Sequence, residues 1–181
     1  MRNMKGQAAM EYLMTYGWAI LAIVLVIAAL IFLNPFRAPE VCLFEQAGFT
    51  CNEPPPQLYA DQGGNLKMNA KLWNQVGQPI IIKKVLCTSA PGSEVPADAE
   101  AQAETPGTEF TLQTGAAFQI GGEGANMQTL QCVDAQGRDM TSSSGQEFRG
   151  KLVVWYSYLN DIDPNIMHQI KANVISKVTQ G

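Results

Sequence analysis

The longest stretch of this chain without a charged side chain runs from Tyr12 to Phe36, and it limits the possible folds more than any other feature. A helix over this stretch is longer than the ~30 Å hydrocarbon core of a bilayer, because each helical residue rises about 1.5 Å. Pro35 lacks a backbone donor and disfavours helical geometry at Asn34, so it predicts the end of the helix. We expect a membrane-spanning helix over residues 7–34. The alternative is a buried helix in a soluble core.

The charges on either side of the apolar stretch predict its orientation. Arg2 and Lys5 precede it, whereas the region after it is acidic and contains all four cysteines. Basic residues favour the cytoplasmic side of a membrane. A cleaved secretory signal has an apolar segment of only about 7–15 residues, which is shorter than this one. We therefore expect the N-terminus in the cytoplasm, the helix retained and the rest of the chain outside.

An acid, Glu11, lies near the start of the apolar segment, where a carboxylate is costly. The simplest interpretation places it at the membrane interface, in contact with water. The surrounding sequence, MRNMKGQAAMEYLMTYGWAILAIVLVIAAL, offers a second one, since it combines a short basic leader, a Lys5-Gly6-Gln7 junction, the spaced glutamate and a long apolar run. This N-terminus resembles the class III signal peptide of archaeal type IV pilins.

The resemblance implies that a prepilin peptidase removes residues 1–6 by cutting after Gly6, so that the mature chain begins at Gln7. Glycine suits such a junction because it has no side chain to obstruct the peptidase. In a helix bundle of low dielectric constant, the carboxylate of Glu11 would pair with the Gln7 amine of a neighbouring subunit and set the register. Two alternatives stay open: Glu11 pairs with the amine of its own chain, or Gln7 cyclises. The sequence departs from the family at Ala9, where serine is common.

Beyond the helix, short alternating segments bounded by turn residues predict strands. Prolines and the Gly63-Gly64 pair mark residues 35–65 as a connector that contains a small disulfide loop. Apolar and polar residues alternate over 66–72 and 170–178, as in half-buried strands. Further candidates lie at 70–87 around a turn at Val76-Gly77, and at 109–122, 127–133 and 147–159. We expect an α+β protein in which residues 66–181 form an extracellular antiparallel β-sandwich of about seven strands. Archaeal pilins commonly carry such a domain on one long helix.

The four cysteines are even in number and lie on the predicted extracellular side, where disulfides form. We expect one disulfide between Cys42 and Cys51, which closes a small loop near the helix exit. We expect the other between Cys87 and Cys132, linking two strands and adding about 2–4 kcal/mol of stability. The other two of the three possible connectivities are the alternatives. A metal site is not expected, because no Cys-x-x-Cys unit is present and His168 is the only histidine.

The sequence contains little that could support catalysis. No phosphate loop or dinucleotide fingerprint is present, and a single histidine leaves few parts for a nucleophile and base pair. Asp161, Asp163 and Asn165 could surround a calcium ion, but the segment lacks the glycine and distant glutamate of that motif, and a hairpin turn explains it more simply. Lys83-Lys84 is better explained as a solvent-facing pair than as a nucleic-acid site, because the net charge is −4. We expect no enzyme activity, no cofactor and no nucleic-acid partner.

The resemblance and the predicted topology lead to one functional expectation. The chain would be a structural pilin subunit that moves from the cytoplasmic membrane into an extracellular filament used for surface adhesion. Its partners would be identical or related pilins, the prepilin peptidase and the pilus assembly machinery. The alternatives are a membrane-retained minor pilin or accessory protein, and a single-pass anchored binding module of the cell surface.

Overall fold

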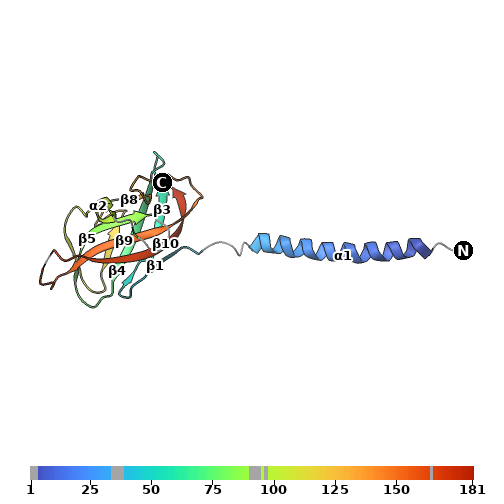
Figure 1. The fold of residues 1–181 in the computed structure, drawn as a ribbon, viewed down its shortest axis with the longest axis horizontal. Coiled ribbons are helices and arrows are strands. Elements are labelled where there is room, and N and C mark those ends of the chain that lie inside the picture. The colour runs from blue at the N-terminus through green and yellow to red at the C-terminus, as the bar shows by residue number, and fades with distance from the viewer. Residues whose placement is uncertain (1–3, 34–38, 90–94, 96–97, 164) are drawn as a thin grey trace. The chain divides into compact units, whose positions relative to one another are not determined.

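The computed structural model describes residues 4–33, 39–89, 95, 98–163 and 165–181, and the chain divides into two units between Ala38 and Pro39. The first unit contains one helix, α1, which spans Met4–Leu33 (Figure 1). The predicted apolar helix is therefore confirmed. It begins three residues earlier than Gln7, because an isolated glycine such as Gly6 costs a long helix only about 1 kcal/mol relative to alanine. The predicted stop at Asn34-Pro35 lies outside the described residues.

The second unit is rich in β-structure. Its elements along the chain are β1 (Val41–Phe44), β2 (Phe49–Thr50), β3 (Gln57–Ala60), β4 (Leu66–Asn74), β5 (Ile80–Thr88), α2 (Ala99–Gln102), β6 (Phe110–Leu112), β7 (Ala117–Ile120), β8 (Leu130–Val133), β9 (Glu147–Tyr158) and β10 (His168–Gln180). The strands expected from alternation over 66–72 and 170–178 are thus present as β4 and β10. A turn also separates β4 from β5, and Gly77 in this turn has a φ of 89°, a value that favours glycine.

Six of these strands form a closed ring rather than the expected sandwich. The order is β10-β3-β4-β8-β5-β9, and β9 pairs with β10 again. Neighbours are antiparallel except at two places, where β3 runs parallel to β10 and β5 runs parallel to β8. These two short parallel ladders join edges that a sandwich would leave open. The alternation along single strands could not separate the two architectures, because both bury one face of each strand.

The interior of the ring is filled with apolar side chains. Leu58, Met68, Leu72, Phe118 and Leu152 are all fully buried there. Burying one such side chain contributes roughly 1.5–3 kcal/mol, so this cluster supplies the main driving force for folding.

A smaller apolar cluster covers the opposite face of the sheet. Along β9, Leu152 and Val154 belong to the interior, whereas Val153 and Trp155 pack with Leu86 and with Ala99 of α2. This two-sided burial explains why β9 is a nearly continuous apolar run without alternation.

The predicted connector at 35–65 requires correction, because the globular unit begins at Pro39 rather than at Leu66. Residues 41–60 contain β1, β2 and β3, which pair with β10 and β4. The prolines in this region suggested a linker. Strands this short carry too few residues for alternation to be seen, and their partners lie far away in the sequence.

A bulge in β5 explains the unusual position of two lysines in a central strand. The register against β9 shifts between Ile82 and Lys84. One inserted residue exchanges the faces of all that follow, so Ile82 and Val85 both point into the core. Lys83 and Lys84 remain partly exposed, and they form ion pairs with Glu109 and Glu100.

Candidate functional site

The most prominent functional feature is the exposed apolar surface of α1. Residues Met10–Phe32 form a segment long and apolar enough to cross a membrane. Every described side chain in this segment is exposed, including Trp18 at 73% and Phe32 at 90%. An apolar surface of this size is unstable in water and requires lipid or other helices to cover it.

The residues of the predicted cleavage junction lie in the first two turns of α1. The backbone is helical through Gly6, Gln7 and Glu11. The side chain of Glu11 is exposed, and its carboxylate makes no ion pair with any described residue, while its backbone carbonyl accepts a hydrogen bond from Thr15 Oγ1 at 2.9 Å. Glu11 is therefore an acid at the edge of an apolar surface, and no described residue neutralises its charge.

A notch interrupts the apolar surface of α1 at Gly17. The hollow has a volume of ≈ 270 Å³ and is lined by Met14, Gly17, Trp18 and Leu21. A Cβ placed on Gly17 would meet nothing within 4 Å. Small residues on membrane helices permit close approach of a second helix, so the notch is suited to accept a side chain from a neighbouring helix.

Both disulfides of the globular unit have the pairing expected from the sequence. Cys42 in β1 bonds to Cys51, which follows β2, and the Cα–Cα distance is 5.6 Å. Cys87 in β5 bonds to Cys132 in β8, and these residues are direct neighbours in the parallel ladder, with a Cα–Cα distance of 4.5 Å. All four cysteines are buried in the core. The second disulfide reinforces one of the two ladders that close the ring.

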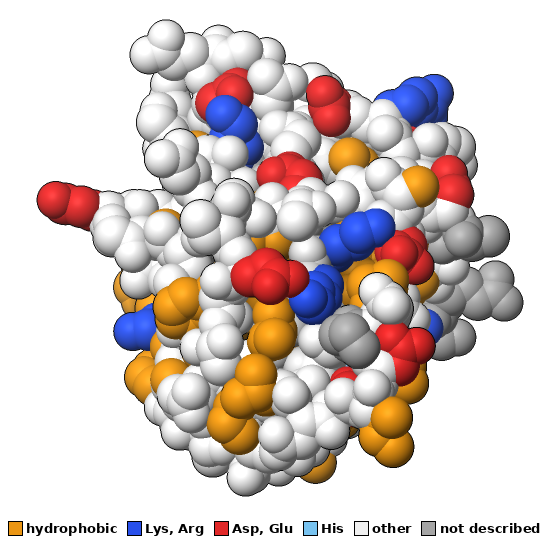
Figure 2. Space-filling model, turned by 90° about the vertical axis from the view of Figure 1, so that its left-hand side faces the viewer, with side chains coloured by type: hydrophobic (Ala, Val, Ile, Leu, Met, Phe, Trp, Pro, Cys, Tyr) orange, Lys and Arg blue, Asp and Glu red, His pale blue; other side chains and the backbone are white. Residues whose placement is uncertain are grey.

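The charged surface of the globular unit is mixed in sign. Figure 2 shows one face, on which Lys and Arg side chains lie beside Asp and Glu side chains rather than in a patch of one sign. Lys83 and Lys84, considered above as a nucleic-acid site, each contact a glutamate. This arrangement supports the interpretation of the two lysines as a solvent-facing pair.

The segment considered as a calcium loop uses its carboxylates within a turn. The Oδ2 atom of Asp161 accepts a hydrogen bond from the Tyr158 N–H and lies 3.3 Å from His168 Nε2. The Oδ1 atom of Asp163 accepts from both the backbone and the side-chain amide of Asn165. These contacts favour the hairpin turn. Among the described residues, no group of three or more His, Cys, Asp and Glu side chains is arranged to hold a metal ion.

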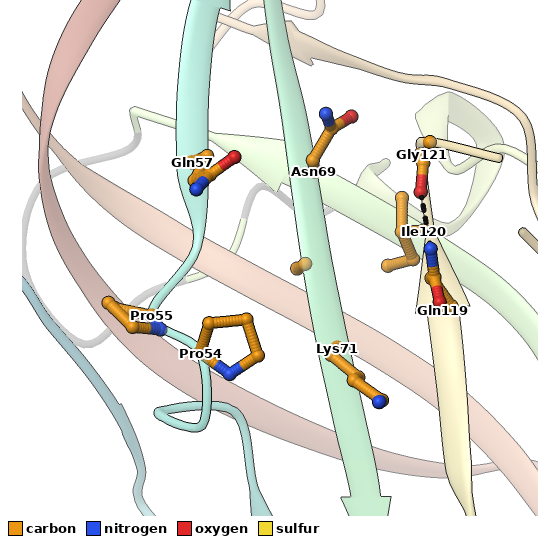
Figure 3. Close-up of a pocket in the computed structure, with 10 residues that line it drawn as sticks. Pro54, Pro55, Gln57, Asn69, Lys71, Gln119, Ile120 and Gly121 are labelled. Carbon is orange, nitrogen blue, oxygen red and sulfur yellow. Dashed lines mark hydrogen bonds between the residues drawn. The ribbon is translucent and has the colours of Figure 1, made fainter.

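A polar groove crosses the outside of the barrel over β4. Its volume is ≈ 290 Å³, and Figure 3 shows that its residues come from β4, from the β3 side and from the end of β7. The lining consists of Pro54, Pro55, Gln57, Asn69, Ala70, Lys71, Gln119, Ile120, Gly121 and Gly122. Sequence analysis did not identify this groove, because its residues are scattered over three segments and match no motif.

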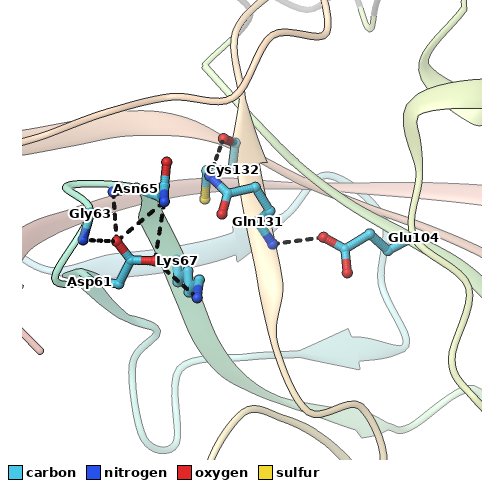
Figure 4. Close-up of polar contacts among 7 residues, drawn as sticks. All are labelled: Asp61, Gly63, Asn65, Lys67, Glu104, Gln131 and Cys132. Atoms are coloured by element: carbon cyan, nitrogen blue, oxygen red, sulfur yellow. Dashed lines mark hydrogen bonds and ion pairs between the residues drawn. The ribbon is translucent and has the colours of Figure 1, made fainter.

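The turn between β3 and β4 is held by Asp61 (Figure 4). Its Oδ1 atom accepts hydrogen bonds from the backbone amides of Gly63 and Asn65, and its Oδ2 atom lies 3.0 Å from Lys67 Nζ. The contact with Lys67, followed by the hydrogen bonds from Asn65, lowers the pKa of Asp61 to about 2. A second carboxylate in Figure 4, that of Glu104, accepts a hydrogen bond from the backbone amide of Gln131 at 2.8 Å, beside Cys132.

These features define a class of protein: an N-terminal helix able to cross a membrane, followed by a disulfide-bonded, β-rich domain. Both membrane anchors and signal sequences have such helices. In comparisons with known proteins, no family model matches the chain, and no significant match was found among the curated proteins or the solved structures.

Proposed function

We propose that this chain is a type IV pilin-like subunit that polymerises through α1 into an extracellular filament, with surface adhesion as its role. The observation that carries the proposal is the exposed apolar surface of α1 with one acid, Glu11, near its beginning. A bilayer can cover this surface before assembly, and the helices of other subunits can cover it afterwards.

In the proposed pathway, cleavage near the N-terminus precedes the transfer of α1 from the membrane into the filament. Lys5, Gly6 and Gln7 resemble the junction that a prepilin peptidase cuts. Cleavage there would remove residues 1–6 and create an amine at Gln7. An unpaired carboxylate is costly in a bundle of apolar helices. The helices would therefore pack only in a register that brings Glu11 to such an amine. The notch at Gly17 supports close packing in the same bundle.

The disulfides support an oxidising environment for the globular unit, because such bonds persist outside the cytoplasm. In the proposed pathway, the precursor is therefore inserted with its N-terminus in the cytoplasm and its β-domain outside. The filament would then have α1 in its centre and the β-domain on its surface.

Mass spectrometry of sheared surface filaments tests the proposal most directly. We expect the chain in this material to begin at Gln7 and to be present in many copies. A mature chain that begins beyond Leu33 would show that α1 is a discarded signal. A full-length chain that stays in the membrane with Arg2 and Lys5 attached would instead identify an anchored surface module.

Substitution of the junction separates processing from assembly. Gly6→Val places a branched side chain at the proposed cleavage site, so the uncut precursor should accumulate in the membrane and form no filaments. Immunoblotting of membrane and sheared fractions measures both outcomes. Normal cleavage and normal filaments from this variant would contradict the assignment of the junction.

Glu11 tests the charge pairing itself. Glu11→Gln removes the charge and keeps the size, so we expect insertion and cleavage to continue while the mature subunit remains in the membrane. Glu11→Leu should insert at least as well, because it removes the cost of a carboxylate near hydrocarbon, but it should assemble no better. If both variants yield normal filaments, charge pairing does not direct assembly.

A further inference from the structure

The polar groove over β4 lies where one edge of this strand is uncovered. Along this edge, β3 pairs with residues up to Asn69, and β2 pairs from Trp73 onward. No described strand pairs with the edge between these two ladders, and Pro54 and Pro55 border the gap instead. On the other edge, β7 pairs with Ala70–Trp73, and its end forms the opposite wall of the groove. The groove is thus built on the rigid sheet rather than on loops alone.

The side chain of Asn69 has a fixed direction in this groove. Its Oδ1 atom is buried, makes no hydrogen bond and packs against Gly121. Gly121 has a φ of +76°, and a Cβ at this position would overlap the Asn69 side chain. In Figure 3 the amide oxygen of Asn69 is on the side of Gly121, and the amide nitrogen points away from Lys71. Asn69 therefore has two N–H donors for which no described group is an acceptor.

Among the described residues that line the groove, Lys71 alone is charged. Its Nζ atom lies 4.9 Å from the centre of the Trp73 ring, and no described acid forms an ion pair with it. The side chain of Gln57 is also without a hydrogen-bond partner among the described residues. Gln119 donates Nε2 to the carbonyl of Gly121 at 3.1 Å, which leaves its own carbonyl as an acceptor. The groove thus combines one cation, an excess of N–H donors and at least one free acceptor.

These groups indicate which chemical groups a ligand of the groove would carry. An anionic group satisfies Lys71, because hydrogen bonds to charged groups are stronger than neutral ones. Neighbouring hydroxyl groups can both donate and accept, as the amides of Gln57 and Gln119 require. The C–H face of a ring can pack on Pro54 and Pro55. The volume of ≈ 290 Å³ lies near the lower end for ligand sites, which suits one ring rather than a large cofactor.

We propose that this groove binds one acidic sugar unit, a uronate, of a polysaccharide. The carboxylate contacts Lys71 Nζ, and the hydroxyl groups contact the amides of Gln57, Asn69 and Gln119. The site belongs to the globular unit and does not involve α1, so its existence is independent of filament assembly.

Calorimetry on the full chain in detergent, with short oligomers of galacturonate and of glucuronate as probes, tests this site. Oligomers of galactose and glucose are the neutral counterparts. We expect at least one acidic oligomer to bind and its neutral counterpart to bind at least ~10-fold more weakly, given the greater strength of charge-assisted hydrogen bonds. Increasing salt should weaken the acidic binding, because it screens the charge on the exposed side of the groove.

Two variants and one control locate the binding. Lys71→Met keeps the apolar stem beside Trp73 and removes the charge, and Gln57→Glu adds a repelling carboxylate at an exposed position. Each variant should bind the acidic oligomer at least ~10-fold more weakly and should have an unchanged melting temperature. The control Lys177→Met removes an exposed lysine of β10 and should leave binding unchanged. The proposal is overturned if no acidic oligomer binds, if the neutral oligomers bind as tightly, or if both groove variants bind like the unmodified chain.

Discussion

Asn74 is a buried amide that holds the turn between β4 and β5. Its Nδ2 atom donates to the carbonyls of Gln78 and Leu112 at 2.9 and 3.0 Å, and its Oδ1 atom accepts from the Val76 N–H. Asn74 therefore satisfies three backbone groups, two in the turn between β4 and β5 and one in β6. This is the turn that the sequence predicted at Val76-Gly77. The asparagine itself gave no signal, because a polar residue next to a turn is normally exposed.

Replacing Asn74 by alanine should destabilise the protein by about 3 kcal/mol, since this buried side chain loses three hydrogen bonds at about 1 kcal/mol each. Chemical denaturation of the two proteins measures the difference. Asn173→Ala is a matched control, because Asn173 is an exposed asparagine in β10, and its free energy of unfolding should change by less than about 0.5 kcal/mol. Equal effects at the two positions would contradict the role assigned to Asn74.

Asp61 should make the stability of the globular unit depend on pH in the acidic range. Its pKa is about 2 in the folded protein and 3.8 in the reference state, so the contribution is complete above pH 3.8 and is lost as the pH falls toward 2. Asp61→Asn should therefore lower the melting temperature at pH 7 and reduce its decrease between pH 4 and pH 2. Solvent screening keeps the effect small. An unchanged pH profile in this variant would show that other carboxylates control the acid response.

At the level of single elements, the two disulfides should differ in their contribution to stability. The Cys42–Cys51 bridge closes a separation of 9 residues and the Cys87–Cys132 bridge one of 45. The chain-entropy relation assigns them about 2.5 and about 4 kcal/mol. Replacing both members of one pair by alanine should thus cost more for Cys87 and Cys132 than for Cys42 and Cys51. Denaturation of the two double variants checks this order.

Thiol titration provides the matching control for the disulfides. The native protein should contain no free thiol before unfolding, because all four cysteines are paired and buried. Free thiols at these positions in native surface material would contradict the bonded state itself.

The elements that could be predicted from the sequence are those with a local signal. Alternation identified β4 and β10, and the apolar run identified α1. The bulge at Lys83 and the parallel pairings of β3 with β10 and of β5 with β8 have no such signal, since they depend on residues far apart in the chain. The polar groove was missed for the same reason, because Asn69 and Gly121 become neighbours only when the sheet forms.

For the whole molecule, we expect the globular unit to fold without α1. A chain that begins at Pro39 should be soluble and should give a β-type circular dichroism spectrum, because its apolar cluster is enclosed within residues 42–178. The same chain without residues 168–180 should aggregate, since the loss of β10 exposes the core and leaves three strands without their partner. A helical spectrum from the first protein would refute the architecture.

The position of β10 in the ring has a consequence for the time course of biosynthesis. This strand follows all other ring strands in the sequence, yet it pairs with β1, β3 and β9. The barrel therefore cannot close on a growing chain, and β1, β3 and β9 each keep an open edge until β10 has emerged. Such delayed, long-range pairing makes the nascent domain slow to fold and prone to wrong contacts. If α1 holds the chain at a membrane during this interval, tethering would keep unfinished copies from diffusing freely.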